Sequence, residues 1–245
     1  MIYAKSPQNI NPLISKAGHD AIVVPVHILQ ENFDDAIGGV LSIANLDGII
    51  VTMPFKEKLL ARMHEASGRA RAVGAINAAR RKADGSWEGD IFDGAGLVAA
   101  AETIGVDPRG LSVGLIGAGG AGSAIAFALA DAGAATLVIN DRDQARAEQL
   151  CTRVARYGPL NPTAQPIDVG QIDLLVHATP LGMNASDGIA IDIEGLTART
   201  AVIDIVTKPQ TALLREAALR GCPHVGGATM VQGQANAILG FLGLD

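Results

Sequence analysis

The sequence predicts an α/β protein with two lobes, one of which is a doubly wound parallel sheet. Three observations carry this prediction. Strands and helices alternate after residue 110, and a glycine-rich loop spans residues 117–122. The residues before 97 have a different sequence pattern, with short apolar runs and a hairpin signal. A chain of 245 residues is long enough for two small lobes or one large one.

The individual elements follow from local patterns. Buried strands are predicted at residues 111–116, 135–140, 173–178 and 201–205, with helices at 123–131 and 142–157. Earlier in the chain, apolar runs at 21–25 and 48–52 alternate with helical patterns at 33–41 and 57–65. Asp84-Gly85 predicts a hairpin between 75–79 and 86–89.

The lobe boundaries are placed where the sequence pattern of predicted strands and helices changes. A helix at 95–104, ended by Gly105, is expected to carry the crossing between the lobes, and residues 232–242 are helical by pattern. We therefore assign residues 1–97 to an amino-terminal α/β lobe, 98–222 to the doubly wound lobe, and 223–245 to a segment that returns to the first lobe.

Composition excludes several classes of protein. Apolar residues make up 49% and charged residues 18%, so a sizeable core is expected and disorder is not. A net charge of -6 without a basic block argues against a nucleic-acid surface. The first residues lack the apolar core of a signal peptide, and no apolar run reaches membrane-spanning length. Cys151 and Cys222 form no disulfide or metal pattern, which favours a reducing, cytoplasmic location.

The histidines show no metal-ligand spacing, and no metal site is predicted. They are His19, His27, His64, His177 and His224. His177 stands out because it lies at the end of a predicted strand, and a structural role for it is favoured over a catalytic one.

The glycine-rich loop has the form G-x-G-x-x-G and joins a buried strand to a helix. In that context the first glycine permits a tight turn, the second lets the backbone approach a pyrophosphate, and the third lets the helix pack on the strand. The loop therefore predicts a Rossmann-type lobe that binds a dinucleotide. Its residues are Gly117, Ala118, Gly119, Gly120, Ala121 and Gly122.

The next strand ends in a charged sequence that bears on the choice of dinucleotide. Asp141 lies about 20 residues after the glycines, where an acid accepts hydrogen bonds from the ribose hydroxyls of NAD and repels the extra phosphate of NADP. Arg142 leaves NADP open, because an arginine here can hold a 2′-phosphate. NAD is favoured, with NADP as the alternative. Asp143 is more simply explained as a charge in the first turn of a helix.

A second polar motif follows the run at 48–50. Val51-Thr52-Met53-Pro54-Phe55-Lys56 places a hydroxyl and an ammonium group at the carboxyl end of a strand, where open α/β sheets bind ligands. Pro54 restrains the backbone, so Lys56 is expected to be held in place by the main chain.

Together these motifs resemble the shikimate/quinate dehydrogenase family in order and over nearly the whole chain. The matching segments are Ser6-Pro7 with Asn11-Pro12, residues 51–56, Gly74-Ala75-Ile76-Asn77, Asp93-Gly94 with Gly96, residues 178–183, residues 204–214 and residues 227–234. The resemblance implies that the first lobe binds substrate and that the protein transfers hydride between a nicotinamide and a secondary alcohol of a cyclic polyol.

The resemblance also implies roles for individual residues. Lys56 and Asp93 would form the polar pair around the reacting hydroxyl, and a lysine beside a carboxylate can accept and return its proton. Other residues would bind substrate (Ser6, Thr52, Asn77, Gln234, with Thr207 as a further candidate) or dinucleotide (the glycine loop with Asp141, Arg142, Thr179, Met183 and Met230). For the two methionines, core packing is nearly as good an interpretation.

The sequence departs from the family at a cluster of positions. Ala4 stands where the family has the first serine of Ser-x-Ser-Pro, Ile91-Phe92 where it has Asn-Thr, Thr207 where a tyrosine is common, and His177 where it has asparagine. Two lost hydroxyls and a bulky phenylalanine would alter the end of the site that holds the ring carboxylate. We therefore expect weak or no turnover of shikimate, and a related cyclic polyol or a differently substituted cyclohexene as the better substrate; compensation by Lys5, Ser6 and Thr207 is the alternative.

Further expectations concern the first residues of the chain, the alternative to an enzyme and the partner. Residues 1–4 leave little room for the strand with which the family begins, which predicts an exposed sheet edge and a plausible dimer surface, or else a start assigned too late. A sensor that keeps the fold and binds a dinucleotide without turnover is the alternative to an enzyme. The expected partner is a small cyclic polyol, on a monomer or homodimer, with no nucleic acid and no membrane.

Overall fold

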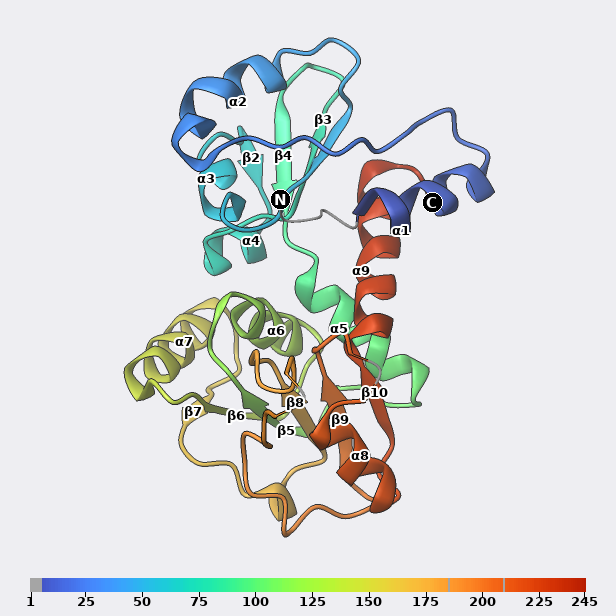
Figure 1. Cartoon of the computed structure of the whole chain (residues 1–245). Helices are drawn as coiled ribbons and strands as arrows, with labels where there is room; N and C mark the ends of the chain where they lie inside the picture. Colours follow the sequence, from blue (N-terminus) through green and yellow to red (C-terminus); the bar gives the residue numbers. More distant parts are fainter. Residues whose placement is uncertain (1–5, 185, 209) are drawn as a thin grey trace. The chain divides into compact units, whose positions relative to one another are not determined.

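The computed structural model describes residues 6–184, 186–208 and 210–245. The chain divides into two compact units (Figure 1). Unit 1 comprises the described residues up to Phe92 together with Ala235–Asp245, and unit 2 is Asp93–Gln234. Because residues 1–5 lie outside the described residues, so do the expectations about the first strand, Ala4 and Lys5.

Unit 1 is an α/β unit built on a small sheet with the order β1-β3-β4-β2 in its described residues. β3 pairs antiparallel with both β1 and β4, while β2 runs parallel to β4. Its elements are α1 (Ser6–Ala17), η1 (Gln30–Asn32), α2 (Phe33–Leu41), β1 (Gly48–Ile50), α3 (Lys56–Leu60), β2 (Glu65–Ala66), α4 (Gly68–Val73), β3 (Ala78–Arg81) and β4 (Trp87–Asp90), with the last part of α9 (Gly227–Leu242).

Two of the local predictions in unit 1 are confirmed. The helix at 33–41 forms with those bounds, and the predicted hairpin is β3–β4. Gly85 takes the left-handed φ of 83° that the turn requires, and Asp84 Oδ1 accepts the Ser86 N–H at 2.9 Å.

Two other local predictions in unit 1 need correction. The helical pattern at 57–65 forms a helix only to Leu60, and Glu65–Ala66 is instead a short strand on β4. The apolar run at 21–25 forms no strand, and Ile22 and Val24 are 74% and 61% exposed. The Asn11 side chain accepts the Val23 N–H and donates to its carbonyl oxygen, so an amide takes the place that a neighbouring strand would have.

Unit 2 is a doubly wound parallel sheet, which confirms the predicted fold. Its described strands have the order β10-β9-β8-β5-β6-β7, and all neighbours are parallel. Its elements are α5 (Asp93–Thr103), β5 (Ser112–Ile116), α6 (Gly120–Asp131), β6 (Thr136–Asn140), α7 (Gln144–Tyr157), β7 (Thr163–Ala164), η2 (Val169–Gln171), β8 (Leu174–His177), β9 (Ala201–Asp204), α8 (Ala212–Leu219), β10 (His224–Gly226) and the first part of α9.

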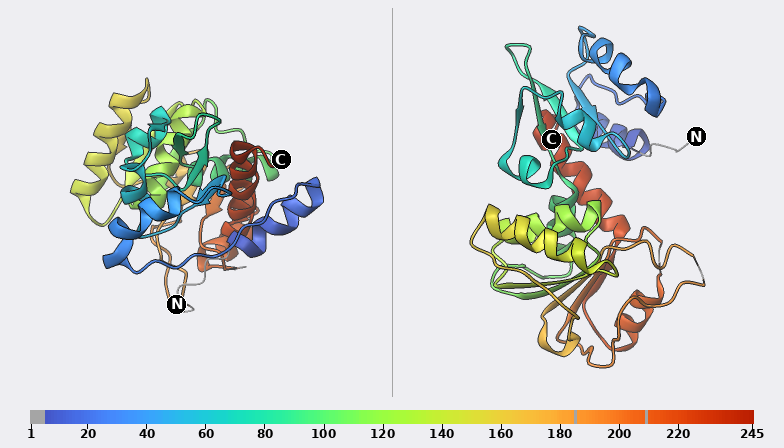
Figure 2. Two further views of the ribbon diagram at one scale, coloured as in Figure 1. Left: turned by 90° about the horizontal axis from the view of Figure 1, so that it is seen from above. Right: turned by 90° about the vertical axis from the view of Figure 1, so that its left-hand side faces the viewer.

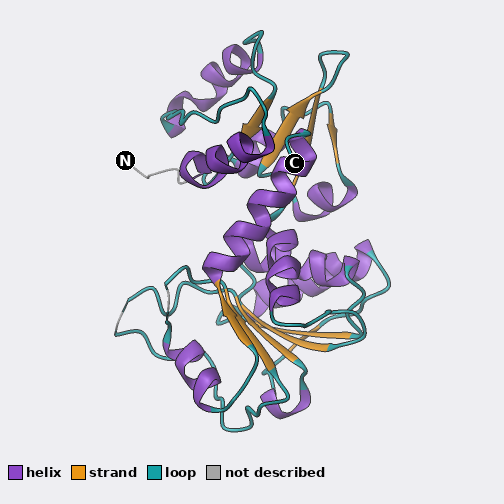
Figure 3. Cartoon of the chain, turned by 90° about the vertical axis from the view of Figure 1, so that its right-hand side faces the viewer, coloured by secondary structure: helices purple, strands orange, loops and turns teal. Residues whose placement is uncertain are grey.

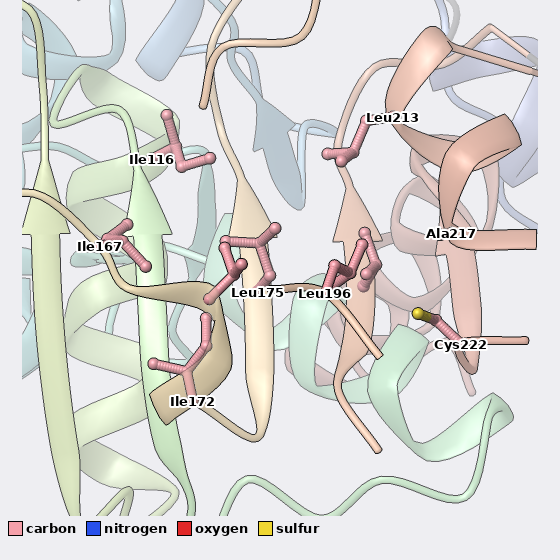
Figure 4. Close-up of a cluster of buried hydrophobic side chains, with 10 residues drawn as sticks. Ile116, Ile167, Ile172, Leu175, Leu196, Leu213, Ala217 and Cys222 are labelled. Carbon is pink, nitrogen blue, oxygen red and sulfur yellow. The ribbon is translucent and has the colours of Figure 1, made fainter. Parts of the chain in front are cut away.

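Helices cover both faces of this sheet (Figure 3). On one face α6 and α7 lie side by side (Figure 2). α6 is apolar on all sides and is buried from Gly122 to Leu129, whereas α7 buries one stripe at residues 147, 150, 151 and 154. On the other face a core cluster joins strands β5, β8 and β9 to α8, with Leu175 and Val202 fully buried (Figure 4).

The boundaries of the units differ from those placed on the sequence. The whole of α5 belongs to unit 2, so the chain crosses before this helix and not within it, and the returning segment begins at Ala235 and not at residue 223. Glycines explain why α5 stays with unit 2. A Cβ at Gly94 would overlap Ala128 of α6, and one at Gly96 would lie 2.5 Å from the Met230 carbonyl oxygen of α9. α5 is therefore packed at backbone distance against two helices of unit 2.

Among the described residues, no helix combines the length and apolar character needed to cross a bilayer.

Candidate functional site

The strand order of unit 2 locates a ligand crevice. Counted from β5, the order is 3-2-1-4-5-6, and the chain changes direction between β5 and β8. Open α/β sheets bind ligands outside the carboxyl ends of the strands at this switch point. The glycine loop follows β5 and residues 178–183 follow β8, so both predicted loops lie there.

The glycines of the loop differ in the space that surrounds them. Gly117 has a left-handed φ of 102°, and a Cβ on it would lie 2.6 Å from the Ala178 carbonyl oxygen. A Cβ at Gly122 would clash with the Gly117 carbonyl oxygen. In contrast, no described atom lies within 4 Å of a Cβ at Gly119 or Gly120, where α6 begins. The fold itself requires the first and last glycines, whereas the middle ones leave a side open to a ligand.

Asp141 lies at the end of β6 and is held against the glycine loop. Its Oδ2 accepts the Ala118 N–H at 2.7 Å and its Oδ1 accepts the Asp143 N–H at 2.9 Å. Arg142 beside it is exposed. Asp143 caps α7 by accepting the Arg146 N–H, as its simpler interpretation predicts.

The loop after β8 is fixed by backbone hydrogen bonds. Asp187 Oδ2 accepts the N–H groups of Gly182 and Asn184, each at 2.9 Å. These bonds, that of Asn184 above all, hold the pKa of Asp187 below its ordinary value. Met183 is 56% exposed, so it is not a core residue. Met230 on α9 is 8% exposed, and here the packing interpretation fits.

Beneath this loop lies a buried polar network that the sequence indicated only through His177. His177 ends β8 and is paired in register with Asp204 at the end of β9. Its Nδ1 lies 3.0 Å from Asp204 Oδ1, and its Nε2 lies 2.6 Å from Thr179 Oγ1. Asp204 also accepts the Thr211 hydroxyl at 2.6 Å. An aspartate ending an apolar strand with a threonine seven positions later is the signal that could have identified the other members.

In unit 1 the candidate residues Thr52, Lys56 and Asn77 are brought together by the backbone. The Val51 N–H donates to the Asn77 carbonyl at 2.9 Å, and the Ile76 N–H donates to the Lys56 carbonyl at 3.1 Å. Lys56 begins α3, which fits the expectation that the main chain holds it. Asn77 is buried, and its Oδ1 accepts the Phe92 N–H at 2.9 Å.

Unit 2 brings together two other candidates, Asp93 and Gln234. Asp93 begins α5 and is 8% exposed, and its Oδ1 accepts a hydrogen bond from Gln234 Nε2 at 2.5 Å. Ser6 begins α1 of unit 1, and Thr207 is exposed after β9. Neither takes part in the hydrogen bonds just described for the candidate residues. In the described part of the chain, no three His, Cys, Asp or Glu side chains are grouped as a metal site would need.

Comparison with known proteins places these features in a family. The family model for the shikimate dehydrogenase substrate binding domain matches residues 2–79, and the model for shikimate / quinate 5-dehydrogenase matches residues 99–181. A shikimate dehydrogenase (NADP(+)) of Rubrobacter xylanophilus is 35% identical over 237 residues, which cover 94% of this chain and 82% of that protein.

Solved structures agree over the whole length. Shikimate 5-dehydrogenase from Listeria monocytogenes, in complex with shikimate and NAD, superposes with a TM-score of 0.90 at 26% identity and covers 100% of this chain and 89% of its own. The ligand-free 5-ketofructose reductase of Gluconobacter sp. has the same TM-score and identity, with 98% and 88% covered. The chain therefore belongs to the shikimate dehydrogenase family and is an oxidoreductase of that type.

Proposed function

We propose that this protein catalyses reversible hydride transfer between a nicotinamide dinucleotide and a secondary alcohol of a cyclic polyol. The observation that carries the proposal is the glycine loop at the switch point of the parallel sheet. Its middle glycines leave space that the packing of unit 2 does not explain, and a pyrophosphate in contact with the loop backbone would use it.

The proposed dinucleotide site consists of the loop from Gly117 to Gly122, Asp141, Arg142, and the loop of Thr179 and Met183. When bound, the nicotinamide supplies the hydride acceptor or donor. Within this site the loop N–H groups and the amino end of α6 would hold the phosphates, and the exposed Met183 would lie against the nicotinamide side. Met230 would support this side through packing.

We propose that Lys56 exchanges the proton of the reacting hydroxyl. The backbone of Lys56 is tied to Ile76, which fixes the point from which its amine extends, and an amine can exchange a proton with a hydroxyl as an acid–base group. Asp93, oriented by Gln234, would bind the reacting or a neighbouring hydroxyl, while Thr52 and Asn77 would bind other ring hydroxyls. Ser6 and Thr207 would hold the far end of the ring.

Replacing Lys56 tests this assignment, and the same helix offers a matched control. Lys56→Ala is expected to lower kcat by about 10²–10⁴-fold, the usual effect of losing a general acid–base group, while dinucleotide binding persists. Lys58→Ala removes a lysine whose Nζ is paired with Asp34 at 3.2 Å, and it should retain activity. Steady-state kinetics with dinucleotide titration would decide, and full activity in Lys56→Ala would contradict the assignment.

For the dinucleotide, we propose that NAD is preferred over NADP. Asp141 places a carboxylate beside the loop, where it would repel a 2′-phosphate. The comparisons do not favour NAD, because the relatives are named for NADP(+) and the solved structures include complexes with NADP and with NAD. Asp141→Asn should shift the ratio of kcat/KM values about tenfold toward NADP, a change of roughly 1.4 kcal/mol. Asp143→Asn, which keeps the cap of α7, should leave that ratio unchanged.

For the substrate, we propose a ring whose carboxylate end differs from that of shikimate. The changes at Thr207 and at Ala4 support this, since each removes a hydroxyl that the family resemblance assigns to the carboxylate. Phe92 supports it less than expected, because its ring packs 5.2 Å from that of Phe241 in unit 1. A panel of shikimate, quinate and other cyclic polyols, run with NAD and NADP side by side, would test it. Efficient use of shikimate at low concentration would contradict the proposal, and binding of dinucleotide without turnover of any member would favour a sensor.

We also propose that the protein is cytoplasmic and is a monomer or a homodimer. Cys151 and Cys222 are both free and buried, as a reducing compartment allows.

A further inference from the structure

We propose that the buried pair His177–Asp204 is a positioning device for the nicotinamide half of the dinucleotide site. It would act on the loop at residues 178–183 and would not touch the ligand itself. The inference rests on the proposed dinucleotide binding and goes beyond it, because it assigns a role to residues outside the loop.

The network is continuous and buried. His177, Asp204 and Thr211 are 3%, 0% and 3% exposed. Asp204 Oδ1 faces the His177 Nδ1 at 3.0 Å and accepts the Val206 N–H at 3.1 Å, while its Oδ2 accepts the Thr211 hydroxyl. Because all these donors converge on one carboxylate, Asp204 ties the end of β8 to the loop that follows β9.

The outer end of the network holds the backbone of the loop after β8 in place. In the imidazole tautomer with its proton on Nδ1, Nε2 accepts the Thr179 hydroxyl proton. The Thr179 oxygen then accepts the Leu181 N–H at 3.2 Å. The Thr179 hydroxyl thus has one partner on each side. His177 fixes the orientation of this hydroxyl, and the hydroxyl in turn holds the backbone at residue 181.

The loop held in this way borders the glycine loop. A Cβ on Gly117 would lie 2.9 Å from Thr179 Cγ2 and 2.6 Å from the Ala178 carbonyl oxygen. On its other side, Gly182 lies against Thr211, whose Cγ2 would be 3.2 Å from a Cβ there. Residues 178–182 are therefore confined between the glycine loop and the network that His177 organises.

The position relative to the sheet indicates which half of the ligand is affected. A dinucleotide binds across the switch point, with one mononucleotide half on each side. Asp141 after β6 marks the adenosine side, so the loop after β8 lies on the nicotinamide side. The hydrogen bonds of the pair support a positioning role, because a buried polar network whose members are all satisfied fixes geometry.

Asparagine, which the family resemblance has at this position, is shorter than histidine. Histidine reaches Asp204 and Thr179 with nitrogens on opposite sides of its ring, and the shorter amide of asparagine cannot reach both. His177→Asn should therefore free the Thr179 hydroxyl while leaving the pocket polar. Thr179→Val is the second variant, because it removes the hydroxyl with little change of shape and leaves His177 and Asp204 in place.

The test compares a whole dinucleotide with ADP-ribose, which lacks the nicotinamide, by calorimetric titration of the full chain. Both variants are expected to raise the Kd of the dinucleotide about tenfold and to change that of ADP-ribose less than about twofold. His224→Asn is the matched control, because Nδ1 of this exposed histidine on β10 contacts the Cys222 carbonyl oxygen two residues away, and the change should alter neither Kd.

The possible results separate the two proposals. Equal weakening of both ligands would mean that the pair merely supports unit 2, and an unchanged dinucleotide Kd would mean that it positions nothing; each result overturns the inference and leaves the proposed function intact. Failure of the unaltered protein to bind either ligand would overturn the proposed function, and this inference with it.

Discussion

At the scale of single residues, the glycine loop separates the demands of the fold from those of a ligand. Gly117 and Gly122 are required by contacts within unit 2, since a side chain at either position would meet backbone atoms. Gly119 has an ordinary φ of −73° and no described neighbour within 4 Å of a Cβ. The sequence motif does not distinguish these cases, because it records a glycine at all three positions.

Gly119→Ala should therefore fold and bind the dinucleotide more weakly. No described atom lies within 4 Å of the added methyl, so the free energy of unfolding should fall by no more than about 1 kcal/mol, the size of an N-cap effect. The methyl would stand where a pyrophosphate is proposed to approach, so the dinucleotide Kd should rise by about tenfold or more. Urea unfolding and calorimetric titration on the same sample would test both parts. Gly122→Ala, in contrast, should destabilise the protein, and unchanged binding by Gly119→Ala would contradict the proposed site.

Other residues show why the site was only partly predictable. Asp141 and Lys56 can be proposed as site residues from the sequence because each follows a strand at a motif distance. Asp204 and Phe92 were not understood, because their roles depend on partners far away in sequence: Asp204 on the end of β8, and Phe92 on Phe241 of α9. A side chain whose function is set by a distant partner leaves little trace in its own neighbourhood.

At the scale of elements, prediction worked where an element carries its own signals. The strands of unit 2 are continuous apolar runs that end at polar residues, and glycine follows α5 at Gly105 with a left-handed φ of 73°. The segment at 21–25 has the composition of a strand and forms none, because the described chain offers it the Asn11 amide and not a strand as partner. β7 and β10 are too short to produce a pattern.

The packing of α5 yields a prediction about stability. At Gly94 an added methyl would overlap Ala128 and lie 2.6 Å from the Ala124 carbonyl oxygen, both on α6. Gly94→Ala should therefore destabilise unit 2 by about 1–3 kcal/mol, the usual cost of overpacking. Far-ultraviolet circular dichroism during urea unfolding would measure it.

The same glycine-to-alanine change should have the opposite effect on stability in α2. Gly38 lies inside that helix with no described atom within 4 Å of a Cβ, so Gly38→Ala should stabilise unit 1 by about 0.5–1 kcal/mol. The single tryptophan, Trp87 on β4, reports on unit 1 by fluorescence. Equal shifts of the unfolding midpoint in the two variants would contradict the packing described for α5.

At the scale of the whole molecule, ionisable groups set the pH range of stability. The pKa of Asp34 lies below its ordinary 3.8 because Arg62 and then Lys58 donate to it, and that of Asp187 is lowered by backbone donors. Such groups stabilise the fold above their unfolded pKa, and this contribution is lost as the pH falls through the folded value. The pKa of Lys82 lies above 10.5 because Glu65 accepts from it, and burial raises the pKa of the Cys151 thiol above 9.0. These contributions are present at lower pH and are lost as the pH rises.

The urea midpoint should therefore be nearly constant at intermediate pH, and should fall as the pH drops below 3.8 and again as it rises above 9.0. Midpoints measured across this range would test the expectation. Asp34→Asn should make the acid limb shallower, and a steep loss of stability near neutral pH would show that other groups dominate.

The discontinuity of unit 1 has a consequence for the order in which the chain is made. Its core includes Ile10 and Ile14 from α1 together with Ala235 and Leu239 from α9, and the whole of unit 2 lies between them in sequence. During synthesis, the residues of unit 2 are complete at Gln234, whereas the part of α1 that packs against Ala235 and Leu239 stays uncovered until the end of α9 follows. Although domains usually fold in the order in which they are translated, here the half that emerges first is the last to close.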